Sequence, residues 1–266
     1  MATAFRMPTE HGAWGILLVP YVCAAVLAGI WNLGIALVGV ASLSLFLLRG
    51  SIEAQAIRAA WREPIHLALL GAGAGSGVAL VFIFHLRALI WLAIAGAALY
   101  SVQRSLARSH EVSRQEKRSL AAELTGVALL TLTAPATWIA ARGRLDPAGV
   151  KVWLLNLLFF LGGVLYVKYR VRGLLTHQQF ASFNERMRFA WPVIVYHILL
   201  VGFLVGAVLV RSFPAAVVLA FAPGVLRALA LLPLLGRRFP IRRLGWSEVA
   251  HAVAFAALLI LTFRGL

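Results

Sequence analysis

Long apolar runs dominate the chain and alternate with short polar stretches. A helix needs about 20 mostly apolar residues to cross the hydrocarbon core of a bilayer. Nine segments meet or approach this length, and very short turns after the first, third and seventh predict antiparallel neighbours there. The predicted segments cover residues 13–30, 33–49, 67–86, 88–104, 119–141, 148–168, 190–211, 214–236 and 245–263.

The amino-acid composition changes the class of protein that these runs predict. Hydrophobic residues make up 62% of the chain and charged residues 13%, whereas soluble domains hold roughly 45–50% and about 25%. An apolar excess of this size requires lipid around the protein. We therefore predict an all-α, polytopic membrane helical bundle that forms a single integral membrane domain over residues 1–266.

The basic residues of the chain indicate its topology. The formal net charge of +16 comes from 25 Lys and Arg against 9 Asp and Glu, and the basic residues form short clusters between apolar runs. This arrangement favours membrane topology over a nucleic-acid-binding face and predicts a cytoplasmic N-terminus and an external C-terminus. The residues assigned to the inner side are Arg6, Arg49, Arg58, Arg62, Arg104, Arg108, Arg114, Lys117, Arg118, Lys168, Arg170, Arg172, Arg186, Arg188, Arg237, Arg238, Arg242 and Arg243.

Ionisable residues gather at the predicted cytoplasmic ends of the segments. Several lie inside apolar runs, where an unpaired charge is costly and usually faces the bundle interior. The pattern predicts a polar chamber that opens inward; the alternative is a set of interfacial charges whose side chains reach the lipid headgroups. The acid–base candidates are Glu10, His11, Glu123, Glu248 and His251, and the ligand-binding candidates are Glu53, Arg58, Lys168, Arg170, Arg172, Asn156 and Arg227.

Arg227 and the Glu248–His251 pair carry the sharpest chemical expectations. Arg227 lies well inside a segment, so its guanidinium requires a carboxylate partner or an anionic ligand. Asn156 and His197 also lie deep, where an interhelical hydrogen bond is the commoner role. Glu248 and His251 share a helix face with the spacing of di-iron bundles, but such a site needs two of these motifs and further carboxylates. We therefore predict no metal site.

The two ends of the chain carry the first family resemblance. Pro8-x-Glu10-His11-Gly12-Ala13-Trp14 with Leu17-Leu18-x-Pro20, and Leu244-Gly245-Trp246-x-Glu248 near the C-terminus, resemble the YwiC-like family of bacterial membrane proteins. The resemblance covers most of the chain. It implies a multi-pass protein of the bacterial cytoplasmic membrane.

A more distant resemblance is to the UbiA superfamily of intramembrane prenyltransferases. The nine segments, the inward chamber and the stretch from Gly12 to Pro20 are similar to those proteins. The resemblance implies transfer of a prenyl group from a diphosphate to an aromatic or quinone-type acceptor, with Mg²⁺ held by two Asp-rich motifs. This sequence departs from both motifs: residues 50–58 contain one Glu and no Asp, and residues 168–173 are basic.

Two hypotheses about function remain open at this point. The first is a UbiA-like membrane protein that binds or modifies an isoprenoid or quinone-type lipid without the Asp-rich Mg²⁺ site, with Lys168, Arg170 and Arg172 on an anionic head. The second is a non-catalytic transporter, lipid-binding protein or assembly partner. Both predict a membrane lipid as partner and no nucleic acid, and neither specifies a cofactor.

Overall fold

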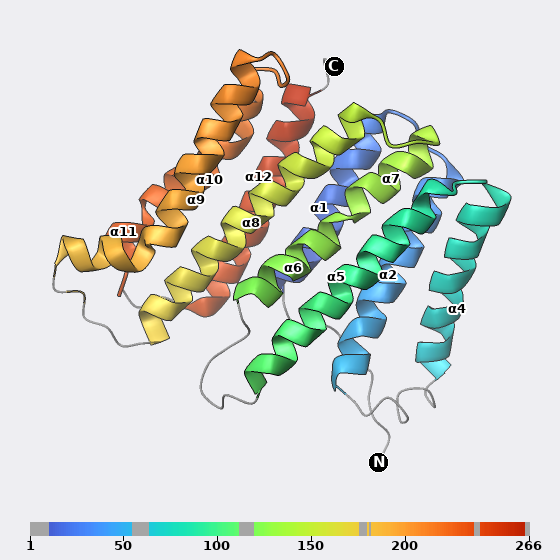
Figure 1. Ribbon diagram of the computed structural model, residues 1–266, viewed down its shortest axis with the longest axis horizontal. Helices are drawn as coiled ribbons and strands as arrows, with labels where there is room; N and C mark the ends of the chain where they lie inside the picture. The colour runs from blue at the N-terminus through green and yellow to red at the C-terminus, as the bar shows by residue number, and fades with distance from the viewer. Residues whose placement is uncertain are drawn as a thin grey trace. The chain divides into compact units, whose positions relative to one another are not determined.

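The computed structural model describes residues 11–54, 64–111, 120–175, 180, 182–236 and 240–263. All regular elements in these ranges are helical (Figure 1). They are α1 (His11–Ala28), α2 (Leu33–Ala54), α4 (Pro64–Val78), the π-helical turn η1 (Ala79–Ile83), α5 (Ala88–Glu111), α6 (Leu120–Thr131), α7 (Thr133–Arg142), α8 (Pro147–Leu175), α9 (Phe183–Leu209), α10 (Val217–Leu229), α11 (Leu231–Leu234) and α12 (Ile241–Phe263).

The predicted polytopic membrane bundle is confirmed within these ranges. Six stretches are long and apolar enough to cross a membrane: residues 64–83, 88–107, 120–142, 147–174, 183–209 and 242–263. Three shorter apolar helices lie at residues 12–28, 33–49 and 217–229. Each of the nine predicted segments therefore corresponds to helical structure, and many large apolar side chains are exposed on the helices, as a lipid environment requires.

Prolines account for two interruptions that the segment pattern did not predict. The fifth segment is divided into α6 and α7, and the eighth into α10 and α11. Pro135 and Pro233 each lack the N–H that would bond the carbonyl four residues earlier, on Thr131 and Leu229. Thr131 and Leu229 are the last residues of α6 and α10, so each helix ends where the backbone bond is lost.

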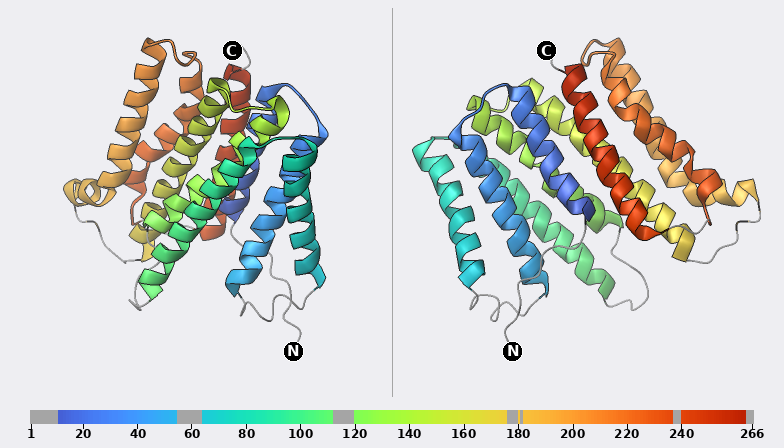
Figure 2. Two further views of the ribbon diagram at one scale, coloured as in Figure 1. Left: turned by 45° about the vertical axis from the view of Figure 1, so that its right-hand side comes forward. Right: turned by 180° about the vertical axis from the view of Figure 1, so that it is seen from behind.

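Contacts within the chain group it into two compact units. Unit 1 comprises residues 1–101 and 129–153, and unit 2 comprises residues 102–128 and 154–266. In unit 1, α2 packs against α4 and α7, and α1 packs against α7. In unit 2, α10 packs against α9 and α12, which Figure 2 shows from behind. The single-domain organisation stays a prediction.

Unit 1 is stabilised by side chains that form hydrogen bonds with the backbone at helix ends. Asn32 donates from Nδ2 to the carbonyl of Ala140 at 2.9 Å, and its Oδ1 accepts from the N–H of Ile35 at 3.0 Å. Arg142 donates from Nη2 to the carbonyl of Ala28 at 2.9 Å, at the last residue of α1. These bonds satisfy carbonyl and amide groups that the helix ends leave without partners. The turn between α1 and α2 is thereby held against the end of α7.

Side chains of α6, α8, α9, α10, α11 and α12 contribute to the interior of unit 2. Its apolar core includes Leu165, Ala190, Val193, Leu231 and Leu235, all buried. The same helices also carry the polar side chains from which the candidate site is built.

Candidate functional site

An ion pair between α10 and α12 forms the centre of the candidate site in unit 2. Arg227 donates from Nη1 to Oε1 of Glu248, and the two side chains are only 12% and 19% exposed. The guanidinium carbon also lies 4.2 Å from the centre of the Tyr166 ring, which is a cation–π contact from α8. We expected either a carboxylate or an anionic ligand beside Arg227, and the structure shows the carboxylate of Glu248 there.

Two consecutive glycines on α8 let these polar groups approach the helix backbone. A Cβ atom on Gly163 would lie 3.6 Å from Oε2 of Glu248 and 4.0 Å from Nη2 of Arg227. A Cβ atom on Gly162 would lie 3.0 Å from Cε1 of Tyr196 and 3.4 Å from Nε2 of His197. Small residues permit such close approach between membrane helices. Gly163 lies about 18 Å from the end of α8, at about 1.5 Å per residue, so the site is well inside the span.

Tyr196 and His197 on α9 each donate a hydrogen bond to a backbone carbonyl. The Tyr196 hydroxyl donates to the carbonyl of Leu158 on α8 at 2.5 Å. His197 is 9% exposed, and its Nδ1 lies 2.7 Å from the carbonyl oxygen of Val193. A carbonyl oxygen only accepts, so Nδ1 carries the hydrogen, and in the neutral ring Nε2 carries the lone pair. His197 thus presents an acceptor beside Gly162.

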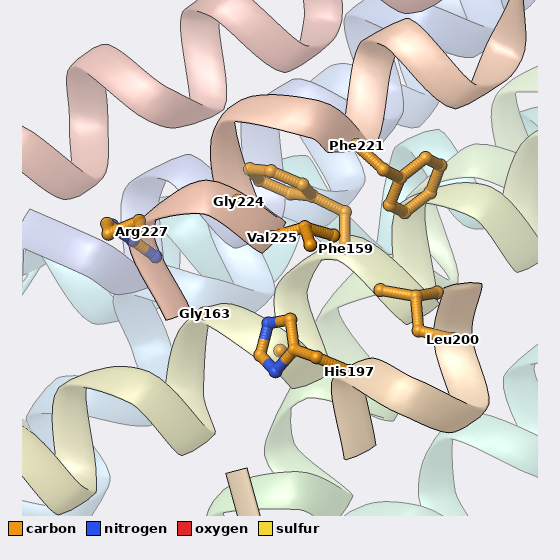
Figure 3. Close-up of a pocket in the computed structure, with 9 residues that line it drawn as sticks. Phe159, Gly163, His197, Leu200, Phe221, Gly224, Val225 and Arg227 are labelled. Atoms are coloured by element: carbon orange, nitrogen blue, oxygen red, sulfur yellow. The ribbon is translucent and has the colours of Figure 1, made fainter. Parts of the chain in front are cut away.

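Gly162, Gly163, His197 and Arg227 line a small hollow together with five further residues (Figure 3). Its walls are Phe159, Gly162, Gly163, His197, Leu200, Phe221, Gly224, Val225 and Arg227. Figure 3 shows Arg227 towards one end, Leu200 and Phe221 towards the other, and His197 between them. The cavity volume is about 20 Å³, slightly more than the ~10–15 Å³ that one water needs. In this form the hollow has room for about one water molecule.

Three aromatic rings from α8, α10 and α12 pack together next to this hollow. Phe159 stacks on Phe255 with ring centres 3.9 Å apart and an interplanar angle of 10°. Phe221 lies edge-on to Phe255 at 5.3 Å and to Phe159 at 6.5 Å. Phe159 and Phe221 belong to both the aromatic cluster and the hollow. The hollow therefore has a polar part at His197 and Arg227 and an aromatic part at the phenylalanines.

The predicted row of cations at the end of α8 contacts three different neighbours. Lys168 forms a 2.9 Å ion pair with Glu123 of α6, and Arg170 donates to the carbonyl of Leu234 in α11. Arg172 lies 6.0 Å from the ring of Tyr169. Residues two apart on a helix point roughly 200° apart, so Lys168 and Arg170 face different helices. Binding of an anionic head by these three residues stays a prediction.

The other sequence candidates in unit 2 are placed as follows. His251 is half-buried, and its Nδ1 donates to the carbonyl of Ser247 at 2.7 Å, one turn earlier in α12. Asn156 is completely buried in α8, seven residues before Gly163. In the described part of the chain, no three His, Cys, Asp or Glu side chains gather closely enough to hold a metal ion. The acid–base roles of Glu123, Glu248 and His251 stay predictions.

The remaining candidates belong to the first quarter of the chain. Glu10 and Arg58 lie outside the described residues. His11 begins α1 and Glu53 lies near the end of α2. The side chains of both lie outside the described part of the structure. A polar chamber that includes these four residues therefore stays a prediction.

Sequence reasoning missed the glycine pair, Tyr166 and the aromatic cluster. Gly162 and Gly163 stand together in a long apolar run, and Tyr166 follows three residues later on the same helix face. That spacing could have predicted a place where another helix approaches α8 closely, beside the polar ring of Tyr166. The aromatic cluster joins residues from three helices, and the chain order gives no sign of it.

Comparison with known proteins bears on the first of the two resemblances. A family model described as YwiC-like protein matches residues 7–138. The chain is 27% identical over 259 residues to a Bacillus subtilis (strain 168) protein named "Uncharacterized protein YwiC", covering 96% of this chain and 97% of the relative. It is 24% identical over 147 residues to an uncharacterized protein of Haemophilus influenzae, covering 55% and 54%. No solved structure matches the chain.

The matched residues include the stretch that suggested this family. Glu10, His11 and Trp14 lie within residues 7–138, and the similarity to the Bacillus protein continues through both units. The UbiA resemblance stays a prediction. The protein is therefore a multi-helix membrane protein that is similar to YwiC-like proteins of bacteria.

Proposed function

We propose that this protein binds an isoprenoid or quinone-type lipid in unit 2, with the polar end of the lipid in the hollow beside Arg227 and His197. The observation that carries the proposal is the composition of that hollow. It places Arg227 and His197 next to Phe159 and Phe221 in the interior of membrane helices. An amphipathic ligand with a small polar end and an apolar ring or tail is complementary to such a site.

Binding without prenyl transfer agrees best with the contacts of the cations. Transfer from a prenyl diphosphate requires groups that stabilise the departing diphosphate, usually Mg²⁺ on carboxylates or several free cations. Lys168 pairs with Glu123, Arg227 pairs with Glu248, and Arg170 bonds to a backbone carbonyl. These groups already have protein partners. We therefore assign the protein to a UbiA-like architecture without the metal-assisted chemistry of that superfamily.

Lipid modification is the second candidate function. It rests on the Glu10–His11 pair, which lies inside the part of the chain that matches the family model. In this version Glu10 and His11, with Glu123, Glu248 and His251, carry the acid–base chemistry. If Glu10→Gln and His11→Ala leave transfer from a labelled prenyl diphosphate in membranes unchanged, or if the unaltered protein shows no transfer, this candidate is rejected.

The proposed location is the bacterial cytoplasmic membrane, with the N-terminus inside and the C-terminus outside. The distribution of Lys and Arg supports this orientation. With this topology the ends of α8, α10 and α11 and the start of α12 lie on the cytoplasmic side.

The test of lipid binding is native mass spectrometry of the protein released from its own membranes. Gly224 lines the hollow and has no atom within 4 Å of its Cβ position, so Gly224→Leu adds bulk beside the hollow without a backbone clash. Gly202 on α9 also has open space, is exposed and lies outside the hollow, so Gly202→Leu is the matched control.

We expect a retained isoprenoid or quinone-type lipid on the unaltered protein and on Gly202→Leu, and its loss from Gly224→Leu. Retention of the same lipid by both variants places the lipid elsewhere and contradicts the proposal. The absence of any such lipid from the unaltered protein, even after incubation with a quinone, contradicts it as well.

A further inference from the structure

Two helices of unit 2 begin with the same spacing of arginine and tryptophan. Arg188 lies three residues before Trp191 on α9, and Arg243 lies three residues before Trp246 on α12. Residues three apart lie on the same face of a helix. Both arginines are exposed, and the two tryptophans are 57% and 56% exposed. Each helix therefore presents a cation and an aromatic ring about one turn apart on its outer surface.

The tryptophans indicate the depth at which these pairs lie in the membrane. α9 and α12 both provide stretches that are long and apolar enough to cross a bilayer, residues 183–209 and 242–263. Exposed tryptophans near the ends of such helices favour the headgroup region. At about 1.5 Å per residue, each arginine lies roughly 4.5 Å closer to the water than its tryptophan. Arginine side chains extend towards the water from such positions, so the guanidinium reaches the level of the lipid phosphates.

The two helix starts are held around one end of the unit 2 core. Phe189 and Leu244, which directly follow Arg188 and Arg243 in the sequence, both pack against the apolar core of this unit. Successive residues of a helix point about 100° apart. Because the neighbour of each arginine faces the core, the arginine itself is turned towards the surface. The two pairs therefore lie at the same end of unit 2 and face outward.

The positive charge at this end is not balanced by carboxylates of the described residues. The ion pairs that the described residues of unit 2 form involve neither Arg188 nor Arg243. The first turn of α12 holds no acidic residue, and Arg242 adds a second exposed cation there. The first turn of α9 holds one acidic residue, Glu185, next to Arg186. This surface therefore favours an anionic partner.

We propose that the starts of α9 and α12 bind the headgroups of acidic phospholipids through the pairs Arg188–Trp191 and Arg243–Trp246. The guanidinium of each arginine donates forked hydrogen bonds to the lipid phosphate, and the indole ring packs on the glycerol and the upper acyl chain. Basic clusters beside membrane helices attract acidic lipids by about fivefold in affinity for each arginine. Neither pair lines the hollow, so this surface and the hollow are separate sites.

A zwitterionic phospholipid and inorganic phosphate are the competing occupants of this surface. Phosphatidylcholine carries the same phosphate, but its own ammonium group cancels the charge. Inorganic phosphate carries the charge, but it has no acyl chain to pack on the tryptophan. An acidic phospholipid satisfies both members of each pair. The experiment therefore compares all three ligands.

Arg188→Gln combined with Arg243→Gln removes the cation of both pairs and leaves the tryptophans in place. The matched control is Arg144→Gln combined with Arg211→Gln, which removes the same charge from two other exposed arginines. A proline, rather than a tryptophan, lies three residues after each control arginine. Melting temperature checks that each variant is folded.

The assay is native mass spectrometry of the full chain in detergent micelles. Dioleoylphosphatidylglycerol is the acidic lipid and dioleoylphosphatidylcholine is the zwitterionic one. Each lipid is titrated alone, and phosphatidylglycerol is also titrated with excess sodium phosphate or with sodium chloride of equal ionic strength. The sodium chloride arm separates displacement by phosphate from screening by salt.

We expect the unaltered protein and the control variant to bind phosphatidylglycerol equally tightly, and several times more tightly than phosphatidylcholine. Arg188→Gln/Arg243→Gln should bind phosphatidylglycerol about fivefold more weakly at each helix start, and its affinity for phosphatidylcholine should change little. Sodium phosphate should displace no more phosphatidylglycerol than sodium chloride does, because a free anion lacks the contact with tryptophan.

Each other outcome overturns the inference. Unchanged affinity in Arg188→Gln/Arg243→Gln, or equal weakening in the control variant, shows that the two pairs do not form the binding surface. Equal affinity of the unaltered protein for the two lipids shows that this surface does not select acidic headgroups. Specific displacement by phosphate shows a site for free anions. If Arg188→Gln/Arg243→Gln does not fold, these last two measurements on the unaltered protein decide.

Discussion

Gly162→Ala is the sharpest test of how the candidate site is packed. The added Cβ would lie 3.0 Å from Cε1 of Tyr196 and 3.4 Å from Nε2 of His197. Ordinary carbon contacts are about 3.5–4.0 Å, so the first distance is short by about half an ångström. The overlap pushes the Tyr196 ring away from α8, and the hydrogen bond from its hydroxyl to the Leu158 carbonyl is lost or lengthened.

Three effects determine the change in the free energy of unfolding. Overpacking of this kind costs about 1–3 kcal/mol, and loss of the Tyr196 hydrogen bond costs about 1 kcal/mol. Replacing glycine by alanine inside a helix returns about 1 kcal/mol. The net expectation for Gly162→Ala is a loss of roughly 1–3 kcal/mol. Gly202→Ala, with no atom near its Cβ, should gain up to about 1 kcal/mol by the helix term alone.

The assay is unfolding by sodium dodecyl sulfate in mixed micelles, followed by circular dichroism. Tyr196→Phe provides the second arm, because it removes the hydroxyl and leaves the ring. It should cost about 1 kcal/mol in the unaltered protein and almost nothing when combined with Gly162→Ala. If Gly162→Ala is as stable as Gly202→Ala, or if Tyr196→Phe costs the same in both backgrounds, the close approach described here is incorrect.

Three further expectations concern other parts of the chain. Lys168→Met should lower the free energy of unfolding by about 1–3 kcal/mol, because it leaves the partly buried Glu123 without its partner. Adding Glu123→Gln to this variant should restore part of the lost stability. If the losses of the two substitutions simply add in detergent unfolding, the pairing is contradicted. In the same assay Asn32→Ala should lower the free energy of unfolding by about 1–3 kcal/mol, because two hydrogen bonds at the α1–α2 turn are lost. Unchanged stability would show that these bonds contribute nothing. In a cysteine-free background, Arg144→Cys should react with an impermeant maleimide added outside intact cells and Arg243→Cys should not; the reverse result inverts the proposed topology.

The helical architecture was predictable because it depends on local properties of the chain. Runs of apolar residues long enough to cross a bilayer specify helices wherever they occur. The divisions after Thr131 and Leu229 coincide with the N–H groups that Pro135 and Pro233 lack. Pro20, Pro192 and Pro223 lie inside undivided helices, so a proline alone does not predict where a helix divides. These features need no knowledge of which helices are neighbours.

The candidate site was predictable only in part, because its pairs join different helices. Arg227 was predicted to need a carboxylate or an anionic ligand. Several glutamates were available, and only the packing of α10 against α12 selects Glu248. Lys168 and Arg170 looked like one anion-binding row in the sequence, yet helical geometry turns them towards α6 and α11. Periodicity along one helix does not carry this information.

The scarcity of carboxylates limits the chemistry that unit 2 supports. The chain has 9 acidic residues against 25 basic ones. Glu123 and Glu248 lie within its apolar segments, and each neutralises a cation, Lys168 or Arg227. A carboxylate engaged in this way has little capacity left for Mg²⁺, and the paired cation has little left for a diphosphate. What the hollow still offers is a lone pair on His197 and the aromatic surface of Phe159 and Phe221, and these groups suit a ligand whose polar end carries no charge.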